Sequence, residues 1–226
     1  MTSTKADRNN VLHVLLLRHG QTDSNAGGMI QGHLPVPLND LGRRQAELLA
    51  TRIADWRPRV EAIVSSDLAR AAQTAEPIAR ACGLEDRVTL DPAWRERGLG
   101  EMEGKIVGDR EIWRAATGKI TPTGAESVPQ FRGRVVEALR TLPTSQAGRS
   151  VVAVVTHGGP IRAILRALLL GELPLEGERG NLEGVEEIAN CSVLHLTWSP
   201  ARGTWRIECF NDVAHLASLA TGTDSG

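Results

Sequence analysis

Aromatic residues are scarce in this chain, which has no tyrosine, two phenylalanines and an aromatic fraction of 3%. Proteins that bind single-stranded nucleic acid stack bases on aromatic side chains, so this scarcity argues against such a platform. The formal net charge is −1, which excludes a global basic field that would attract nucleic acid or an anionic membrane surface. We therefore expect neither nucleic acid nor a membrane as a partner.

Cysteine and long apolar segments are scarce as well. The three cysteines, Cys82, Cys191 and Cys209, are dispersed and odd in number. Their spacing fits neither a disulfide framework nor a metal site and is typical of a protein kept in a reducing compartment. The apolar run 11–17 is far too short to span a bilayer, and no signal-peptide pattern leads into it. The sequence thus predicts a cytoplasmic protein with no bound metal ion and no cofactor.

What the sequence does contain is a regular alternation of strand and helix patterns. The predicted strands are 11–17, 62–64, 87–90, 151–155, 188–197 and 204–209, and the predicted helices are 40–56, 67–81, 127–141 and 160–170. Asn39 and the segment Ser65-Ser66-Asp67 are the expected N-caps of the first two helices. This order predicts a single α/β domain over 1–226, built as a three-layer α/β/α sandwich with a mostly parallel mixed sheet.

Some segments depart from this alternation. Residues 92–130 are rich in glycine and charge, and we expect them to form an insert or lid over the C-terminal edge of the sheet. The polar termini, 1–10 and 218–226, are expected to be flexible. The last two strands flank the turn-rich segment 199–203 and predict an antiparallel hairpin at the sheet edge, which could pair across a homodimer.

Polar clusters follow the apolar strands, at the edge where parallel α/β sheets bind their ligands. They are Arg18-His19, Arg70 in the helix after 62–64, Thr156-His157-Gly158-Gly159, and the charged, Gly-rich segment 94–104 of the insert. Taken alone, Arg18-His19, Arg70 and the segment 94–104 are more simply explained as solvated surface, and the segment 156–159 is explained equally well as a structural turn. The glycine pair also lets a backbone come close to an anion, where a helix N-terminus offers N–H donors.

Taken together, the clusters supply a complete set of groups for phosphoryl transfer. Arg18, Arg70 and a protonated His157 could hold the phosphate oxygens. His19 could attack phosphorus as a neutral imidazole, and one carboxylic acid of the insert could protonate the leaving oxygen. The arginines and histidine would then take the place of a metal cation.

At this point the ordered motifs, from about residue 11 to 216, resemble those of the histidine phosphatase superfamily, also called phosphoglycerate mutase-like. The matching segments are Leu17-Arg18-His19-Gly20-Gln21-Thr22 with Asn25, Ile30-Gln31-Gly32-His33, Ser65-Ser66-Asp67-Leu68-Ala69-Arg70, Glu96 with Gly100-Glu101-Met102-Glu103-Gly104, Gly124-Ala125-Glu126-Ser127, Thr156-His157-Gly158-Gly159, Asn190-Cys191-Ser192-Val193, and Asn211-Asp212-Val213-Ala214-His215-Leu216.

The resemblance implies a role for each matching position. His19 would be the phosphorylated nucleophile, and Glu96 the proton donor and later the base for water. The positions that would hold the phosphoryl group are Arg18, Arg70 and His157. The implied substrate-binding positions are Asn25, Gln31, Gly32 and Gly158. Glu101 and Glu103 are nearby carboxylates that fit the motif less well than Glu96, and the role of His33 stays open.

The superfamily contains hydrolases and mutases, and two features favour a hydrolase. Between 105 and 125 no two basic residues are adjacent, whereas the phosphoglycerate mutases carry an adjacent arginine pair, and the Gln31-Gly32 segment resembles the phosphatase branch. We therefore predict a phosphomonoesterase that acts on a small phosphorylated metabolite. The alternatives are a bisphosphoglycerate-dependent phosphoglycerate mutase and, less in keeping with the intact motifs, a non-catalytic phosphate-binding domain.

The sequence leaves the substrate open. The insert could contact the organic part of the substrate through Trp94 and Trp113, which would suit an insert core equally well. A second anionic group could be favoured by Arg95, Arg97 and Arg114, although a solvated position explains these arginines more simply.

Overall fold

The computed structural model describes residues 11–109, 111, 115, 117, 121–177 and 187–220. Its strands form one sheet in the order β3-β2-β4-β1-β5-β6. The strands are β1 (Leu12–Arg18), β2 (Ala62–Ser65), β3 (Val88–Leu90), β4 (Val151–Thr156), β5 (Val193–Ser199) and β6 (Thr204–Asp212). The pairs β1–β4, β4–β2 and β2–β3 are parallel, whereas β5 joins β1 and β6 joins β5 antiparallel. The predicted mixed sheet and its edge hairpin are confirmed.

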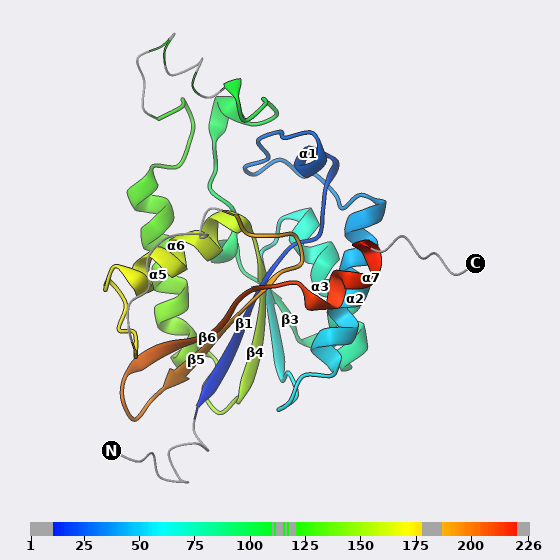
Figure 1. Ribbon diagram of the computed structural model, residues 1–226. Coiled ribbons are helices and arrows are strands. Elements are labelled where there is room, and N and C mark those ends of the chain that lie inside the picture. The colour runs from blue at the N-terminus through cyan, green and yellow to red at the C-terminus, as the bar shows by residue number, and fades with distance from the viewer. Residues whose placement is uncertain are drawn as a thin grey trace, which may run out of the picture.

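Helices cover both faces of the sheet (Figure 1). The helices are α1 (Asp23–Ala26), α2 (Asp40–Ala54), α3 (Ala69–Cys82), α5 (Val128–Ser145), α6 (Gly158–Leu169) and α7 (Ala217–Ala220). The 3-10 turns are Glu85–Arg87, Pro92–Trp94, Gly100–Met102 and Ala214–Leu216. Helices α5 and α6 lie on one face, and α2, α3 and α7 on the other, which gives the expected three layers (Figure 1). No helix in the described part of the chain is long and apolar enough to cross a membrane.

The two faces of the sheet carry separate apolar cores because successive side chains of a strand point to opposite sides. Val152 and Val154 of β4 pack with residues of α5 and α6, while Ala153 and Val155 pack with residues of α2 and α3. Every residue of β4 is buried, as expected for a central strand covered on both faces. Because β1, β2 and β4 each contribute residues to both cores, packing holds the C-terminal ends of these three strands in place relative to one another.

The helix boundaries follow most of the predicted local signals. Asn39 caps α2 through a hydrogen bond from Gly42 N–H, and Gly83 ends α3 in the left-handed conformation with φ 67°. The prediction that Ser65-Ser66-Asp67 caps α3 is wrong, because Leu68 is the N-cap and no side chain caps that helix. Instead, Asp67 pairs with Arg95 of the insert. A tertiary ion pair has therefore replaced the local cap.

The insert covers the C-terminal ends of the strands, as predicted, and several contacts fasten it there. Trp94 is buried, and its carbonyl accepts a hydrogen bond of 2.7 Å from Thr156 Oγ1 at the end of β4. An isolated bridge joins Met29 to Ile106, so the insert also lies against the loop that follows α1. At the other end of the chain, α7 includes residues 218–220. The expected flexibility of the termini stays a prediction. The dimer predicted through the edge hairpin stays a prediction.

Candidate active site

Three neighbouring strands bring three of the predicted segments to one point. Arg18 of β1 is aligned with Thr156 of β4, and Ser65 of β2 with Val155 of β4. The strands therefore end at almost the same level, and the next residue of each chain segment enters the same region. The backbone N–H of His19 donates to the carbonyl of Thr156 over 2.9 Å, which ties the end of β1 to that of β4.

His19 is held in one tautomer. Its ring is buried, and Nδ1 lies 2.7 Å from the carbonyl oxygen of Gly20. A carbonyl can only accept a hydrogen bond, so Nδ1 carries the proton and Nε2 keeps its lone pair. Burial, with the positive charges of Arg18 and Arg70, lowers the pKa of His19 well below its usual value. The ring is thus a neutral imidazole with Nε2 available as a nucleophile.

The two predicted arginines flank this imidazole. Arg70 is 1% exposed, and its guanidinium donates to the carbonyls of Gly32 over 2.8 Å and Leu34 over 3.1 Å. Burial lowers the pKa of Arg70 to about 10, which leaves the group charged at neutral pH. Arg18 donates to the carbonyl of Ile188. In both side chains Nε is buried and has no hydrogen-bond partner among the described residues.

His157 lies beside His19, with the ring centroids 5.0 Å apart, but it does not line the cavity. Its Nε2 is 2.9 Å from Ser66 Oγ, and the side chain is fully buried. Burial, followed by the nearby His19 and Arg70, lowers the pKa of His157 well below its usual value. The lowered pKa disfavours the protonated His157 expected from the sequence, and a bound phosphate dianion would favour it by its negative charge.

Glu96 sits at the N-terminus of α6. One carboxylate oxygen accepts the Gly159 N–H over 3.0 Å, and the other accepts the Arg97 N–H over 2.9 Å. A Cβ at position 159 would lie 1.9 Å from Glu96 Oε1, so any larger residue there would displace the Glu96 carboxylate. The Gly159 N–H, one of the helix N-terminal groups that the sequence suggested for anion binding, therefore binds Glu96 instead. Gly158 lines the cavity.

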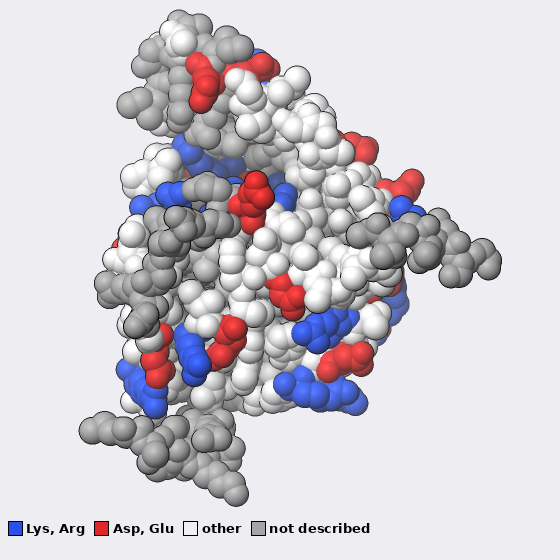
Figure 2. All heavy atoms as spheres, viewed as in Figure 1, with Lys and Arg blue, Asp and Glu red and all other residues white. Residues whose placement is uncertain are grey.

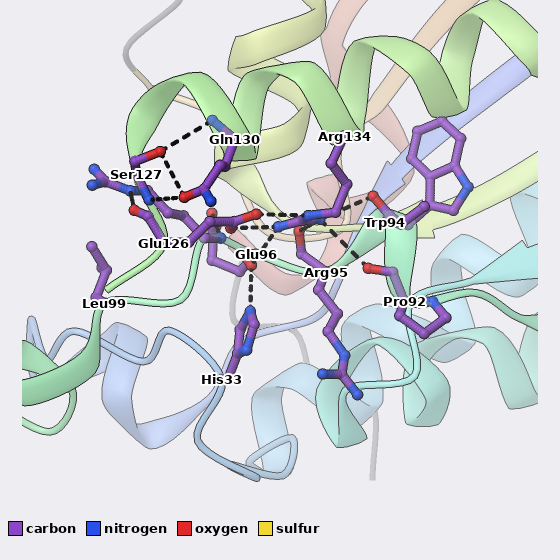
Figure 3. Close-up of polar contacts among 12 residues, drawn as sticks. His33, Pro92, Trp94, Arg95, Glu96, Leu99, Glu126, Ser127, Gln130 and Arg134 are labelled. Carbon is purple, nitrogen blue, oxygen red and sulfur yellow. Dashed lines mark hydrogen bonds and ion pairs between the residues drawn. The ribbon is translucent and has the colours of Figure 1, made fainter. Parts of the chain in front are cut away.

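A second helix fixes the segment that carries Glu96 (Figure 3). Arg134 of α5 donates to the carbonyls of Ala93 and Arg95, both over 3.0 Å, and of Glu96 over 3.3 Å. The same guanidinium forms a two-pronged ion pair with Glu126, with distances of 2.9 and 2.7 Å. Arg134 therefore ties α5 both to the segment that carries Glu96 and to Glu126, which precedes the helix.

The loop after α1 is fastened to the insert from the other side. The His33 ring donates to the carbonyl of Glu96 over 2.8 Å (Figure 3). Glu103 accepts the N–H groups of His33 and Leu99. Gly32 has φ 48°, a left-handed conformation that favours glycine, and a Cβ there would lie 2.1 Å from Glu103 Oε1 and displace that side chain. Glu103 therefore serves loop closure and does not line the cavity.

Asn25 and Gln31 both reach the cavity. The side-chain oxygen of Asn25 accepts hydrogen bonds from Thr22 and Asn190, so its amide N–H groups are the end that can donate to an anion. Asn190 also donates to the carbonyl of His19 over 3.0 Å and supports that turn. The Oε1 atom of Gln31 is buried without a partner among the described residues.

These residues surround a cavity of about 520 Å³, a size typical of small-molecule sites. Eight of the nine predicted site residues line it: Arg18, His19, Asn25, Gln31, Gly32, Arg70, Glu96 and Gly158. Lys and Arg atoms are visible inside a recess on this face of the molecule (Figure 2). No group of three or more His, Cys, Asp or Glu side chains within the described ranges could hold a metal ion.

Several lining or supporting residues were not predicted from the sequence. Ser66, Arg134 and Arg132 belong to this group, as do Arg162 and Arg166 of α6. A signal for the last two was present, because they follow Gly158 at intervals of four residues and so share its face of the helix.

Of the arginines suggested for a second anionic group, one reaches the cavity. Arg97 lines it, whereas Arg95 is paired with Asp67. Arg114 lies outside the described residues, as do Trp113 and the basic residues Arg110 and Lys119. Trp94 is buried core.

The sheet order, the histidine at a strand end and the arginine-lined cavity define a phosphate-ester site on a three-layer α/β fold. A family model described as histidine phosphatase superfamily (branch 1) matches residues 14–213. The chain belongs to this superfamily, which confirms the resemblance seen in the sequence.

The relatives of this chain include proteins named as phosphatases and one named as phosphoglycerate mutase-like. The chain is 36% identical to phosphoglycerate mutase-like protein 4 of Arabidopsis thaliana over 212 residues, which cover 90% of this chain and 86% of that protein. It is 33% identical to the metal-independent phosphoserine phosphatase of the same plant over 218 residues, covering 92% and 85%. Among solved structures, a mycobacterial glucosyl-3-phosphoglycerate phosphatase in complex with VO3 superposes with a TM-score of 0.72 and 31% identity, over 88% of this chain and 99% of that chain.

Proposed function

We propose that the protein is a metal-independent phosphomonoesterase that hydrolyses a small phosphorylated metabolite through a phosphohistidine at His19. The observation that carries the proposal is the fixed tautomer of His19, whose Nδ1–H is committed to Gly20 and whose Nε2 is left as the nucleophile. The names of two relatives, a phosphoserine phosphatase and a glucosyl-3-phosphoglycerate phosphatase, support a hydrolase. A cytoplasmic location, suggested by the cysteine pattern, is part of the same proposal.

In the first step, Nε2 of His19 attacks phosphorus, so that an N–P bond forms and the ester P–O bond breaks. Arg18 and Arg70 stabilise the charge on the equatorial oxygens. Glu96, in its acid form, transfers its proton to the departing oxygen, and the alcohol leaves.

In the second step, Glu96 takes a proton from a water molecule, and the oxygen of that water attacks phosphorus. The N–P bond breaks, inorganic phosphate is released, and Glu96 is again protonated. His157 contributes to both steps once a bound phosphate dianion raises its affinity for a proton, and Ser66 holds its ring in place.

The proposal is tested with the purified protein in the presence of a chelator. We expect release of phosphate from p-nitrophenyl phosphate. After a quenched turnover with a phosphate-radiolabelled substrate, the protein should carry a label that is stable in base and lost in acid, as expected for a phosphohistidine. A His19→Ala variant should lose both, whereas exposed Arg140→Gln should keep both. Labelling of the His19→Ala variant at the wild-type level would refute the assignment.

The mutase is the second candidate, because one relative is named as phosphoglycerate mutase-like. The two functions are separated by incubation with 3-phosphoglycerate, with and without 2,3-bisphosphoglycerate. A hydrolase releases phosphate in both cases. Efficient bisphosphoglycerate-dependent isomerisation without net phosphate release would replace the phosphatase proposal by the mutase.

A further inference from the structure

The turn that follows β1 is bound by two side chains that come from α2 and α3, which lie on the same face of the sheet (Figure 1). The Gly20 N–H donates to Thr74 Oγ1 of α3 over 3.0 Å, and the Gln21 N–H donates to Gln45 Oε1 of α2 over 2.9 Å. Neither Thr74 nor Gln45 lines the cavity. Any effect of these two residues on the reaction must therefore pass through the turn.

The hydroxyl of Thr74 has a fixed direction. Its single proton is donated to the carbonyl of Arg70, one turn earlier in α3, over 2.7 Å. The lone pairs of the same oxygen are then left to accept, and one of them takes the Gly20 N–H. Thr74 is 0% exposed, so no solvent water can take the place of this hydroxyl. The contact joins the turn after His19 to the helix that carries Arg70.

Gln45 acts on the next peptide group of the turn. The carbonyl of Gly20 and the N–H of Gln21 belong to one planar peptide unit. Its carbonyl oxygen lies 2.7 Å from His19 Nδ1, and its N–H donates to Gln45. A peptide group that donates through its N–H is polarised and becomes a stronger acceptor at its oxygen. Gln45 thus orients the carbonyl that holds the imidazole and strengthens that hydrogen bond.

Close backbone packing brings α2 within reach of the turn. A Cβ on Gly20 would lie 2.5 Å from the carbonyl oxygen of Gly42 in the first turn of α2, and a Cβ on Gly42 would lie 2.0 Å from the carbonyl oxygen of Gln21. Both obstacles are main-chain atoms, which cannot rotate aside as the end of a side chain can. This approach of two backbones allows Gln45, one turn further along α2, to reach the Gln21 N–H.

We propose that Thr74 and Gln45 are positioning residues for phosphoryl transfer, because they fix the two peptide groups on either side of the Gly20 Cα and thereby the orientation and tautomer of the His19 ring. The inference rests on the proposed function, in which His19 is the nucleophile. A displacement of a reacting atom by about 1 Å can cost about 10²-fold in rate. Loss of either contact should therefore slow the chemical step, while phosphate binding should change little.

The kinetic test uses p-nitrophenyl phosphate as the substrate and inorganic phosphate as a competitive inhibitor. Thr74→Val keeps the branched shape but removes the hydroxyl, and it should lower kcat by about 10- to 100-fold. Thr74→Ser restores the hydroxyl and should recover most of the rate. Gln45→Met should lower kcat by about three- to tenfold, since Gln45 is partly exposed and water can replace its oxygen. In all three variants the inhibition constant of phosphate should stay within about threefold of the wild type.

Thr51→Val is the matched control. Thr51 lies on α2 and donates to the carbonyl of Glu47, four residues earlier, over 3.2 Å, which is the same kind of bond that Thr74 makes within α3. The Thr51 side chain is exposed and contacts no part of the site. This variant should keep the wild-type kcat and phosphate inhibition constant.

A second readout does not depend on turnover. NMR spectra of the ring nitrogens in histidine-labelled protein show which nitrogen carries the proton, and His19→Ala identifies the signals of His19. In the wild type we expect the proton on Nδ1 alone. Thr74→Val and Gln45→Met should each show a second population with the proton on Nε2, whereas Thr51→Val should match the wild type.

The proposal is refuted if Thr74→Val and Gln45→Met both keep the wild-type kcat, or if kcat falls while the His19 signals stay unchanged. Should Thr74→Val fail to fold, Gln45→Met decides by the same two measurements because its side chain is partly exposed. A wild-type protein without phosphatase activity would overturn the proposed function instead. The NMR comparison would then still show whether Thr74 and Gln45 hold the ring.

Discussion

Replacing Arg134 by glutamine should disable the proton-donor segment without touching the nucleophile. The substitution removes three hydrogen bonds to the carbonyls of Ala93, Arg95 and Glu96, together with both prongs of the ion pair with Glu126. Glutamine keeps a polar side chain but is too short and has too few donors to replace this set. The segment that carries Glu96 would keep the Thr156 contact of Trp94, the Arg95–Asp67 pair and the His33 contact, but it would lose its attachment to α5.

The expected loss of unfolding free energy depends on the solvent exposure of the Arg134–Glu126 ion pair. The Arg134 and Glu126 side chains are 23% and 20% exposed, so water can replace part of what is lost. Each bond then contributes about 1 kcal/mol net, and the variant should lose about 2–4 kcal/mol of unfolding free energy. For a chain of this size this corresponds to a decrease in Tm of about 5–15 °C.

The kinetic effect should depend on the leaving group. General acid catalysis typically contributes 10²- to 10⁴-fold, and we expect a displaced Glu96 to lose about 10- to 100-fold in kcat/KM on an alkyl phosphate. The p-nitrophenolate leaving group needs little protonation, so p-nitrophenyl phosphate should be affected only a few fold. The ratio of the two values is the readout, because general destabilisation lowers both alike.

Three comparisons make this test decisive. Glu126→Gln should shift the ratio in the same direction by a smaller factor, since the carbonyl contacts of Arg134 remain. Arg134→Lys should recover part of the wild-type ratio because it keeps one charge. Arg140→Gln, on the exposed face of α5, should leave the ratio unchanged. An equal decrease on both substrates in Arg134→Gln would refute the positioning role.

Three further results are expected. Gly159→Ala should lower kcat/KM on alkyl phosphates because its Cβ would collide with Glu96, whereas Gly133→Ala, with open space around the new Cβ, should be neutral or stabilising by up to about 1 kcal/mol; comparable losses in the two variants would contradict this. Glu96→Gln should slow alkyl phosphates more than p-nitrophenyl phosphate in steady-state assays, and equal slowing would argue against a general acid. The lowered pKa values of His19 and His157 mean that the unfolded chain binds more protons below about pH 6.5, so the free energy of unfolding measured in urea should fall from pH 7 to pH 5, by up to about 1.4 kcal/mol per pH unit for each histidine; a flat profile would contradict the shifts.

Local signals predicted the elements whose stability is local or periodic. The buried run of β4 and the caps at Asn39 and Gly83 are where the sequence placed them, because apolar periodicity and φ preference act over a few residues. The cap expected at Asp67 failed because a partner distant in the sequence, Arg95, competes for its carboxylate. Capping propensity is worth about 1 kcal/mol, and such a tertiary ion pair can outweigh it.

The sequence by itself determined the chemical set: an imidazole at the end of a strand, arginines, a Gly-rich helix start and a carboxylate in the insert. Only the tertiary structure decided what each group can do. Packing fixed the tautomer of His19, buried His157 behind the cavity wall and brought Arg162 and Arg166 to that wall. These outcomes depend on contacts between residues far apart in the chain and on burial, and neither can be obtained from the spacing of a motif.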